Sequence, residues 1–363
     1  MPAGDLGLAE PAGPPRVVLI TGVTRLLGTQ LAGRLAADPS IERVIGVDTV
    51  TPGPDAVRRL GRTELVRADI RNPLIARVVA SGNVDTVVHL GVVAAPLGTG
   101  GRAAMKEVNI IGTMQLLAAC QQAPAVRRLV VRSSTGVYGS SPRDPALFTE
   151  QTEPRSAPRS GCGKDAVEIE GYVRGFGRRR PDVALSVLRI TNLLGAGAET
   201  PLGRYLALPV VPTVLGFDPR LQLCHVDDAT EVLRRFAIGD HPGTYNVGGV
   251  GVLLLSQALR RLGRPSFPVP PAAVSLVAQL LRRGGLVEFS PEQLRLCEHG
   301  LVADVTRLRA RLGWAPRPTA QVLEAVATDG SPRRVVSPER AAGVEHRVLE
   351  LVGGRRHREP AGA

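Results

Sequence analysis

Residues 16–28 read Arg16-Val-Val-Leu-Ile-Thr-Gly-Val-Thr-Arg-Leu-Leu-Gly28, a short run of mostly β-branched and apolar residues followed by a turn with two glycines. An apolar run of this length is typical of a strand that is buried on both faces of a parallel sheet. Residues 29–38 then carry leucines at helical spacing. The segment therefore predicts a strand, a glycine turn and a helix in direct succession.

The same alternation of strand and helix continues along the chain. It predicts strands over 43–48, 65–69, 86–90, 128–133 and 183–189 and helices over 72–81, 103–122 and 164–179. Such alternation favours an α/β fold with a doubly wound parallel sheet. Beyond Asn192 the pattern is irregular and proline-rich, with strands expected over 221–226 and 244–247 that return to the first domain and short helices over 256–262 and 290–296.

These patterns divide the chain into four predicted parts. Residues 1–15 are an expected disordered leader, and residues 16–190 with 221–247 form the dinucleotide-binding domain. Residues 191–220 and 248–328 make a smaller α/β cap at the C-terminal side, which is expected to bind the substrate. Residues 329–363 are polar and basic and are expected to form a flexible tail.

Composition excludes several classes of function. The chain has 363 residues and a net charge of +12, but its arginines are scattered and aromatic residues make up only 3%, which argues against a nucleic-acid partner. Four cysteines without paired spacing predict neither a disulfide framework nor a metal site. No secretory leader or membrane-spanning run is evident, so a cytoplasmic protein without membrane insertion is expected.

The glycine turn and a later acidic residue predict a site for NAD. Glycines let the backbone approach a pyrophosphate, and the N-terminus of the following helix favours its negative charge. Asp48 follows Gly28 by 20 residues and ends the second strand, where a carboxylate binds the adenosine ribose and repels the 2′-phosphate of NADP. The predicted turn contacts are Gly22, Thr24, Arg25, Leu26, Leu27 and Gly28.

Further motifs follow in order along the chain. They are Asp69-Ile70, His89-Leu-Gly-Val92, Asn109-Ile-Ile-Gly-Thr113, Arg132-Ser-Ser-Thr-Gly-Val-Tyr-Gly139, Leu188-Arg-Ile-Thr-Asn192-Leu-Leu-Gly195, His225-Val-Asp-Asp228, Tyr245-Asn-Val-Gly248 and Leu312-Gly-Trp-Ala-Pro316. With the glycine turn, they resemble the extended short-chain dehydrogenases, the NAD-dependent epimerase/dehydratase family, over residues 16–328. The chain is most similar to an actinobacterial subgroup labelled UDP-glucose 4-epimerase-like.

The resemblance implies a Rossmann-type domain and a set of contacts to NAD. Besides the turn and Asp48, the implied contacts are Asp69, Ile70, Leu90, Gly91, Val92, Asn109 and Lys164. The chain departs from the family at the second glycine of the turn, which is Arg25. That arginine either clamps a phosphate of the cofactor or points into solvent.

The resemblance also implies a homodimer formed by the helices over 103–122 and 164–179, with Met114, Leu117 and Ala118 as compatible apolar positions.

The family's catalytic tyrosine is missing from the expected place. The family pairs a tyrosine base with a lysine four residues later and a Ser or Thr that orients the substrate hydroxyl. Ser134, four residues before the tyrosine of Val-Tyr-Gly, takes the last role, with Thr135 as a weaker candidate. Lys164 matches the lysine, but its partner is Ser160. A serine hydroxyl is a far poorer base than a phenol whose pKa is about 10.

Two interpretations of function therefore stay open. The first is an NAD-dependent epimerase, dehydratase or reductase that acts on a nucleotide-sugar or related polyol, with Asn192 and Arg220 at the substrate's diphosphate. Arg220 stands one residue away from the family's position for this arginine. The second is a non-catalytic NAD(H)-binding regulatory or scaffold protein that keeps the fold.

Overall fold

A seven-stranded parallel sheet organises the computed structural model, which describes residues 13–91, 101–153, 158, 161–283 and 298–328. In sheet order, the strands are β11 (Gly243–Val247), β6 (Ala184–Ile190), β5 (Arg128–Ser134), β4 (Thr86–His89), β1 (Val17–Thr21), β2 (Arg43–Asp48) and β3 (Glu64–Arg67). Every neighbouring pair is parallel. The predicted doubly wound sheet is confirmed, and its winding changes direction between β1 and β4, where such sheets bind ligands.

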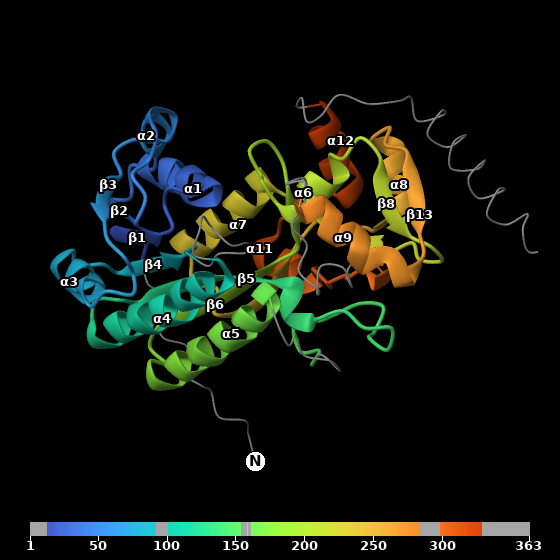
Figure 1. Ribbon diagram of the computed structural model, residues 1–363. Helices are drawn as coiled ribbons and strands as arrows, with labels where there is room; N and C mark the ends of the chain where they lie inside the picture. The colour runs from blue at the N-terminus through green and yellow to red at the C-terminus, as the bar shows by residue number, and fades with distance from the viewer. Residues whose placement is uncertain (1–12, 92–100, 154–157, 159–160, 284–297, 329–363) are drawn as a thin grey trace, which may run out of the picture.

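Helices cover both faces of this sheet (Figure 1). α1 (Leu26–Ala36) and α7 (Val226–Ile238) lie on one face, and α3 (Leu74–Ser81), α4 (Gly101–Gln122) and α5 (Gly161–Arg179) lie on the other. Because side chains alternate along a strand, Val18 and Ile20 of β1 pack against the first layer, whereas Val17 and Leu19 pack against the second. Burial on both faces explains why β1 reads as a continuous apolar run.

Three small sheets build the cap beside the carboxyl edge of the main sheet. β7 (Asn192–Leu194) pairs with β10 (Leu223–His225), β9 (Arg220–Leu221) with β12 (Leu253–Leu254), and β8 (Val211–Val214) with β13 (Ser266–Val269). α6 (Pro201–Leu206), α8 (Leu255–Arg261) and α12 (Thr319–Thr328) share a separate core with these strands. The remaining described helices are α2 (Pro54–Leu60), η2 (Thr135–Tyr138), η3 (Pro271–Ala273), α9 (Val274–Arg283) and α11 (Thr306–Leu312).

The expected single strand over 221–226 is wrong. The chain forms β9 and β10 there, and both pair with cap strands outside the main sheet. Gln222 separates them, and its side-chain amide donates to the carbonyls of Gly249 and Ala303. The segment is apolar because its residues are buried partly in the core of the first domain and partly in the core of the cap. Its composition therefore predicts a strand but does not indicate the sheet to which the strand belongs. The helix expected over 290–296 lies outside the described residues.

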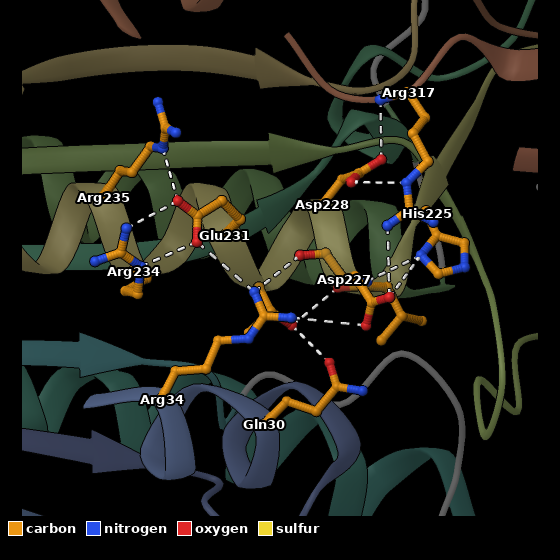
Figure 2. A network of polar contacts seen from close by, with 11 residues as sticks. Gln30, Arg34, His225, Asp227, Asp228, Glu231, Arg234, Arg235 and Arg317 are labelled. Carbon is orange, nitrogen blue, oxygen red and sulfur yellow. Dashed lines mark hydrogen bonds and ion pairs between the residues drawn. The ribbon is translucent and has the colours of Figure 1, made fainter. Parts of the chain in front are cut away.

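Helix α7 holds the C-terminal segment against the first domain (Figure 2). The Asp228 carboxylate accepts hydrogen bonds from the backbone N–H of Arg317, at 2.9 Å, and ion-pairs with its Nε at 3.2 Å. In the same turn of α7, the carbonyl of Asp227 accepts a hydrogen bond from Arg34 of α1 at 3.2 Å. The acidic first turn of α7 thus connects α1, α7 and the segment that leads into α12, and it suits the positive end of the helix dipole.

A buried ion pair fixes α5 on the sheet. Arg189 of β6 binds Glu170 of α5 through Nη2–Oε2 and Nε–Oε1 contacts of 2.6 and 3.0 Å, and both side chains are almost fully buried. Burial alone would lower the pKa of Arg189, but hydrogen bonding and the charge of Glu170 raise it above its usual value. Ser133 of β5 donates to the same carboxylate at 2.7 Å. One carboxylate therefore joins α5 to two adjacent strands.

The two ends of the main sheet differ. At one end α11 packs on β11. At the other end β3 has four residues, three of them exposed. Glu64 of β3 pairs with Arg43 of β2 through two hydrogen bonds of 2.7 and 2.9 Å. Within the described residues, no helix is long and apolar enough to cross a membrane.

Candidate functional site

The glycine turn has the tight geometry that a dinucleotide site requires. Gly22 has φ +72°, and a Cβ there would lie 3.0 Å from the backbone of Gly91. A Cβ on Gly28 would lie 2.2 Å from the Gly22 carbonyl oxygen, so the helix can pack on the turn only when residue 28 is glycine. Leu27 is buried in the core and Leu26 is half-buried, which leaves their backbone N–H groups at the helix N-terminus.

Asp48 lies directly beside this turn. Its Oδ2 accepts hydrogen bonds from the backbone N–H and the hydroxyl of Thr24, at 3.1 and 2.6 Å. Its Oδ1 accepts from the backbone N–H of Thr49 at 2.8 Å. A long contact of 3.5 Å from the backbone N–H of Val50 to Oδ1 is the fourth hydrogen bond to this carboxylate, which has about four acceptor positions. These bonds orient Asp48, and a ribose hydroxyl would replace the long contact from Val50.

Arg25 is the N-cap residue of α1, and its side chain is half-buried. Burial lowers its pKa, and the nearby charge of Asp48 opposes that effect. Burial lowers the pKa of Arg132, near the end of β5, and the charge of the Arg25 guanidinium acts in the same direction. The Arg25 guanidinium thus interacts electrostatically with Asp48 and Arg132, which belong to two strands of the main sheet. Two arginines at the carboxyl edge of the sheet suit an anionic ligand.

The residues after β3 are engaged mainly with protein groups. The Asp69 carboxylate binds Arg71 through contacts of 2.6 to 3.1 Å, and this hydrogen bonding lowers its pKa. Ile70 is buried against Gly112 of α4, where a Cβ would lie 2.6 Å from the Ile70 side chain. Leu90 is buried in the core, Gly91 lies against the turn, and Val92 lies outside the described residues. The expected contact of Asp69-Ile70 with adenine stays a prediction.

A buried chain of hydrogen bonds connects β1, β4 and α4 below the turn. The His89 ring contacts the hydroxyl of Thr21 through Nδ1 at 2.7 Å and that of Thr113 through Nε2 at 3.0 Å. Thr113 also donates to the Asn109 carbonyl at 2.5 Å. Burial lowers the pKa of His89 to about 4, so its imidazole is neutral near pH 7. The motifs that begin at His89 and at Asn109 thus form a buried hydrogen-bonded layer that connects β1, β4 and α4.

Asn109 itself points toward α5. Its side-chain amide donates to the carboxylate of Asp165 at 3.0 Å, and both residues are fully buried. The structure brings Asn109 to the first turns of α5, next in sequence to Lys164. Its predicted contact with the cofactor is not tested by this geometry.

A cavity of about 200 Å³ lies where the carboxyl ends of β5 and β6 meet the cap. The predicted substrate residues Ser134, Thr135, Asn192 and Arg220 all line it. Arg220 also donates to the Ala146 carbonyl at 3.0 Å, and Asn192 to the Gln222 carbonyl at 3.2 Å. The chain thus gathers four predicted residues from β5, η2, β7 and β9 around one space.

Ser134 and the following turn form the cavity's inner wall. The Ser134 hydroxyl accepts a hydrogen bond from the backbone N–H of Gly136 at 3.1 Å and so caps η2. Tyr138 ends η2 with its phenol buried, where it donates to Asn246 at 2.8 Å. Burial raises the pKa of Tyr138. Tyr138 therefore does not supply the missing phenol of the cavity.

Lys164 lies away from this cavity. Its ammonium is 3.9 Å from the carboxylate of Glu168, and its side chain is 44% exposed. Lys106 of α4 approaches the same carboxylate at 3.8 Å. The α5 residues that line the cavity are Cys162, Ala166 and Ile169. Lys164 follows Cys162 by about 200° around the helix at 3.6 residues per turn, so it points elsewhere. Ser160 lies outside the described residues.

Two further residues of the cavity wall, Arg132 and Cys162, were not among the predicted site residues. Burial lowers the pKa of Arg132 to about 10, the charge of Arg25 acts in the same direction, and Cys162 opposes both. Arg132 could have been found from the alternation along β5, which places it on the same face as Ser134. Cys162 has no such signal, because the rotation of α5 decides which of its residues face the cavity.

The residues at the switch point fit NAD. The glycine cradle, the helix N-terminus and Asp48 stand where a dinucleotide's pyrophosphate and adenosine ribose are bound in such folds. Among the described residues, no group of three His, Cys, Asp or Glu side chains is placed to hold a metal ion.

Comparisons with a family model and with sequence relatives both relate the chain to known proteins. The model of the NAD dependent epimerase/dehydratase family matches residues 18–248. An uncharacterized protein of Mycobacterium tuberculosis is 47% identical over 93% of this chain and 90% of its own length. A UDP-glucose 4-epimerase of Mycolicibacterium smegmatis is 29% identical over 82% of this chain and 93% of its own.

Solved structures agree in fold. A dTDP-glucose 4,6-dehydratase of Bacillus anthracis in complex with NAD has a TM-score of 0.65 at 18% identity, covering 86% of this chain and 95% of that one. A UDP-glucose 4-epimerase of Thermotoga maritima with UDP-glucose has a TM-score of 0.64 at 20% identity, covering 86% and 97%.

The buried histidine gives the protein a pH-dependent stability. Because the pKa of His89 is lowered to about 4 from 6.5, the unfolded chain binds a proton between these pH values and the folded chain does not. Stability is therefore complete above pH 6.5 and falls as the pH drops toward 4. Urea unfolding should show a loss of about 2 kcal/mol between pH 7 and pH 5 from this residue.

The change His89→Gln should remove that part of the pH dependence, since glutamine does not titrate. His299→Gln, in the cap, is the matched control and should keep the full slope. Equal slopes for the native protein and His89→Gln would contradict the assignment.

Proposed function

The chain belongs to the NAD-dependent epimerase/dehydratase family, and we propose that it is an NAD-dependent oxidoreductase of the epimerase or dehydratase type that acts on a nucleotide-sugar or related polyol. The proposal depends on one observation, the cavity of about 200 Å³ at the carboxyl edge of the main sheet. The glycine turn lies at the same edge, and Ser134, Asn192 and Arg220 line the cavity. Three of the proteins named above, the Mycolicibacterium smegmatis epimerase and the two enzymes of known structure, are named for UDP-glucose or dTDP-glucose, which supports this class of substrate.

NAD is the family's cofactor, and the chain's own residues provide for it. The backbone N–H groups of Leu26, Leu27 and Gly28 would hold the pyrophosphate, Arg25 would add a cation there, and Asp48 would accept from the adenosine ribose. When bound, NAD supplies a hydride acceptor at its nicotinamide ring.

On the substrate side, Arg220 and Asn192 hold the diphosphate, and Ser134 orients the reacting hydroxyl, with Thr135 beside it. Lys164 keeps the role at the nicotinamide ribose that the sequence predicts, and Ser160 occupies the sequence position of the family's tyrosine. The active site is therefore atypical.

One observation favours the alternative, a non-catalytic NAD(H)-binding regulatory or scaffold protein. Lys164 pairs with Glu168 and does not line the cavity. An enzyme that used the family's tyrosine and lysine would need the tyrosine at the reacting hydroxyl and the lysine close beside both the tyrosine and the nicotinamide ribose. The two functions differ in whether the cavity binds a nucleotide-sugar.

Binding of UDP-glucose and dTDP-glucose in the presence of NAD tests the proposed function. Calorimetry should detect binding of at least one of them, and Arg220→Gln should weaken it about tenfold, since a charge-assisted contact to phosphate is lost. Arg77→Gln, on the exposed side of α3, is the matched control and should bind as the native protein does. Turnover is followed by absorbance of NADH and by chromatography of the sugars. Binding of NAD without any nucleotide-sugar would favour the non-catalytic alternative.

The cofactor preference has its own test. NADH should bind at least tenfold more tightly than NADPH, because the Asp48 carboxylate repels a 2′-phosphate. Asp48→Ala should erase this preference, and Asp48→Asn, which keeps an acceptor for Thr24, should separate the loss of charge from the loss of shape. Tighter binding of NADPH by the native protein would refute the assignment and would indicate Arg25 as a phosphate clamp.

We also propose that the protein is a homodimer formed through α4 and α5. Ile111, Met114 and Ala118 lie on one exposed stripe of α4, and Tyr172 of α5 is 40% exposed. The expectation for Leu117 is wrong, because that side chain is buried within the chain's own core.

Light scattering at micromolar concentration should give the mass of two chains. Met114→Glu should reduce it to one, because a charge would be buried in an apolar interface. Leu276→Glu, at an exposed leucine of α9, is the control and should leave the mass unchanged. A single-chain mass for the native protein would exclude the dimer.

A further inference from the structure

The face of α5 that meets the cavity carries a thiol. Cys162, Ala166 and Ile169 line the cavity, and their spacing of four and three residues places them on one side of the helix. Among these three, Cys162 alone can accept or donate a proton. The titratable group that α5 presents to the proposed substrate site is therefore a thiol and not the ammonium of Lys164.

Two glycines bring this thiol to the wall that holds Ser134. A Cβ on Gly163 would lie 2.8 Å from the Gly136 carbonyl oxygen, and one on Gly136 would lie 3.7 Å from the Gly163 Cα. The start of α5 thus packs on η2 backbone to backbone. Since Cys162 precedes Gly163 and Ser134 caps η2, both side chains line one wall of the same space.

The surroundings favour the ionised thiol. Cys162 is the second residue of a 19-residue helix, where the helix dipole stabilises a negative charge. Arg132 lines the same cavity, and its electrostatic interaction with Cys162 is attractive. Other charged or titratable groups on the elements around the thiol are Arg25 at the N-cap of α1, Tyr205 of α6, Arg220 of β9, Lys106 of α4, and Lys164, Asp165, Glu168 and Glu170 of α5 itself.

An independent feature marks this cavity as a ligand site. Thr191, in the cavity wall, is 7% exposed, and among the described residues its hydroxyl is buried without a hydrogen-bond partner. Buried hydroxyls in folded proteins are nearly always hydrogen-bonded. A polyhydroxylated ligand would supply the partner.

We propose that the Cys162 thiolate is the proton acceptor of the site, in place of the phenol that the chain lacks; this rests on the proposed function. Its Sγ takes the proton of the substrate hydroxyl that Ser134 orients, so the O–H bond breaks and an S–H bond forms. When NAD, the family's cofactor, is bound, its oxidised nicotinamide would accept the carbon-bound hydrogen as hydride, and the substrate alcohol would become a carbonyl. A thiol ionises nearer neutral pH than a phenol, whose ordinary pKa is about 10.

The pH dependence of alkylation tests this directly and without turnover. Iodoacetamide modification of Cys162 is followed by peptide mass spectrometry from pH 5 to 10. The rate should reach half its maximum below about pH 7.5, whereas an ordinary thiol does so near 8.5. Cys120 and Cys224 should not react at neutral pH, because they are buried and burial raises the pKa of each.

Two variants of Arg132 test whether its charge sets the pH midpoint of Cys162 alkylation. Arg132→Gln should move the midpoint up by about one pH unit, which is a tenfold slower reaction at low pH, and Arg132→Lys should retain most of the effect. Arg77→Gln is the control and should leave the midpoint in place. A native midpoint at or above 8.5, or one that Arg132→Gln does not move, would overturn the proposal.

Substrate binding links the thiol to the chemistry. Saturating UDP-glucose with NAD should slow the alkylation of Cys162 at least tenfold, and Cys162→Ser and Cys162→Ala should bind NADH normally but lose roughly 10²–10⁴-fold in turnover. Full turnover in both variants would overturn the role of Cys162 and leave the proposed function standing. Absence of any bound UDP- or dTDP-sugar would overturn both.

Discussion

The contact between Glu170 and Arg189 is the constraint on which the geometry of the site depends. An almost fully buried carboxylate is stable only when it is paired and hydrogen-bonded, and loss of one partner from such a pair costs about 3–5 kcal/mol. Helix α5 must therefore sit where Glu170 reaches β6 and the hydroxyl of Ser133 on β5. This placement fixes the rotation of α5, and the rotation decides which of its residues meet the cavity.

Much of the fold was predictable because it depends on local patterns. Residues 43–48 form β2 as predicted, and β1, β4, β5 and β6 differ from their predicted ranges by one residue at each affected end. Buried parallel strands read as apolar runs, and such runs are clear in a chain with many charged residues elsewhere. The cap was predicted less well. Its strands have two to four residues, and their pairing depends on tertiary contacts such as those of Gln222.

The candidate site, like the fold, has a part that could be predicted from the sequence and a part that could not. The glycine turn and Asp48 could be recognised from spacing, because strand, turn and helix fix their relative positions. Several motif residues proved to have structural contacts: His89 and Thr113 bind each other, and Asn109 binds Asp165. Sequence spacing could not distinguish these roles from contact with a cofactor. It also could not reveal Cys162, since the direction of a helical side chain depends on how the whole helix docks.

The outermost strand, β3, bears on how the protein avoids aggregation. An exposed strand offers unpaired backbone groups on which another chain can add a strand, and short length and charge are the common protections. β3 has four residues and places the Glu64–Arg43 ion pair at this border, while α11 packs on the opposite end of the sheet. Addition of a foreign strand is therefore disfavoured at both ends.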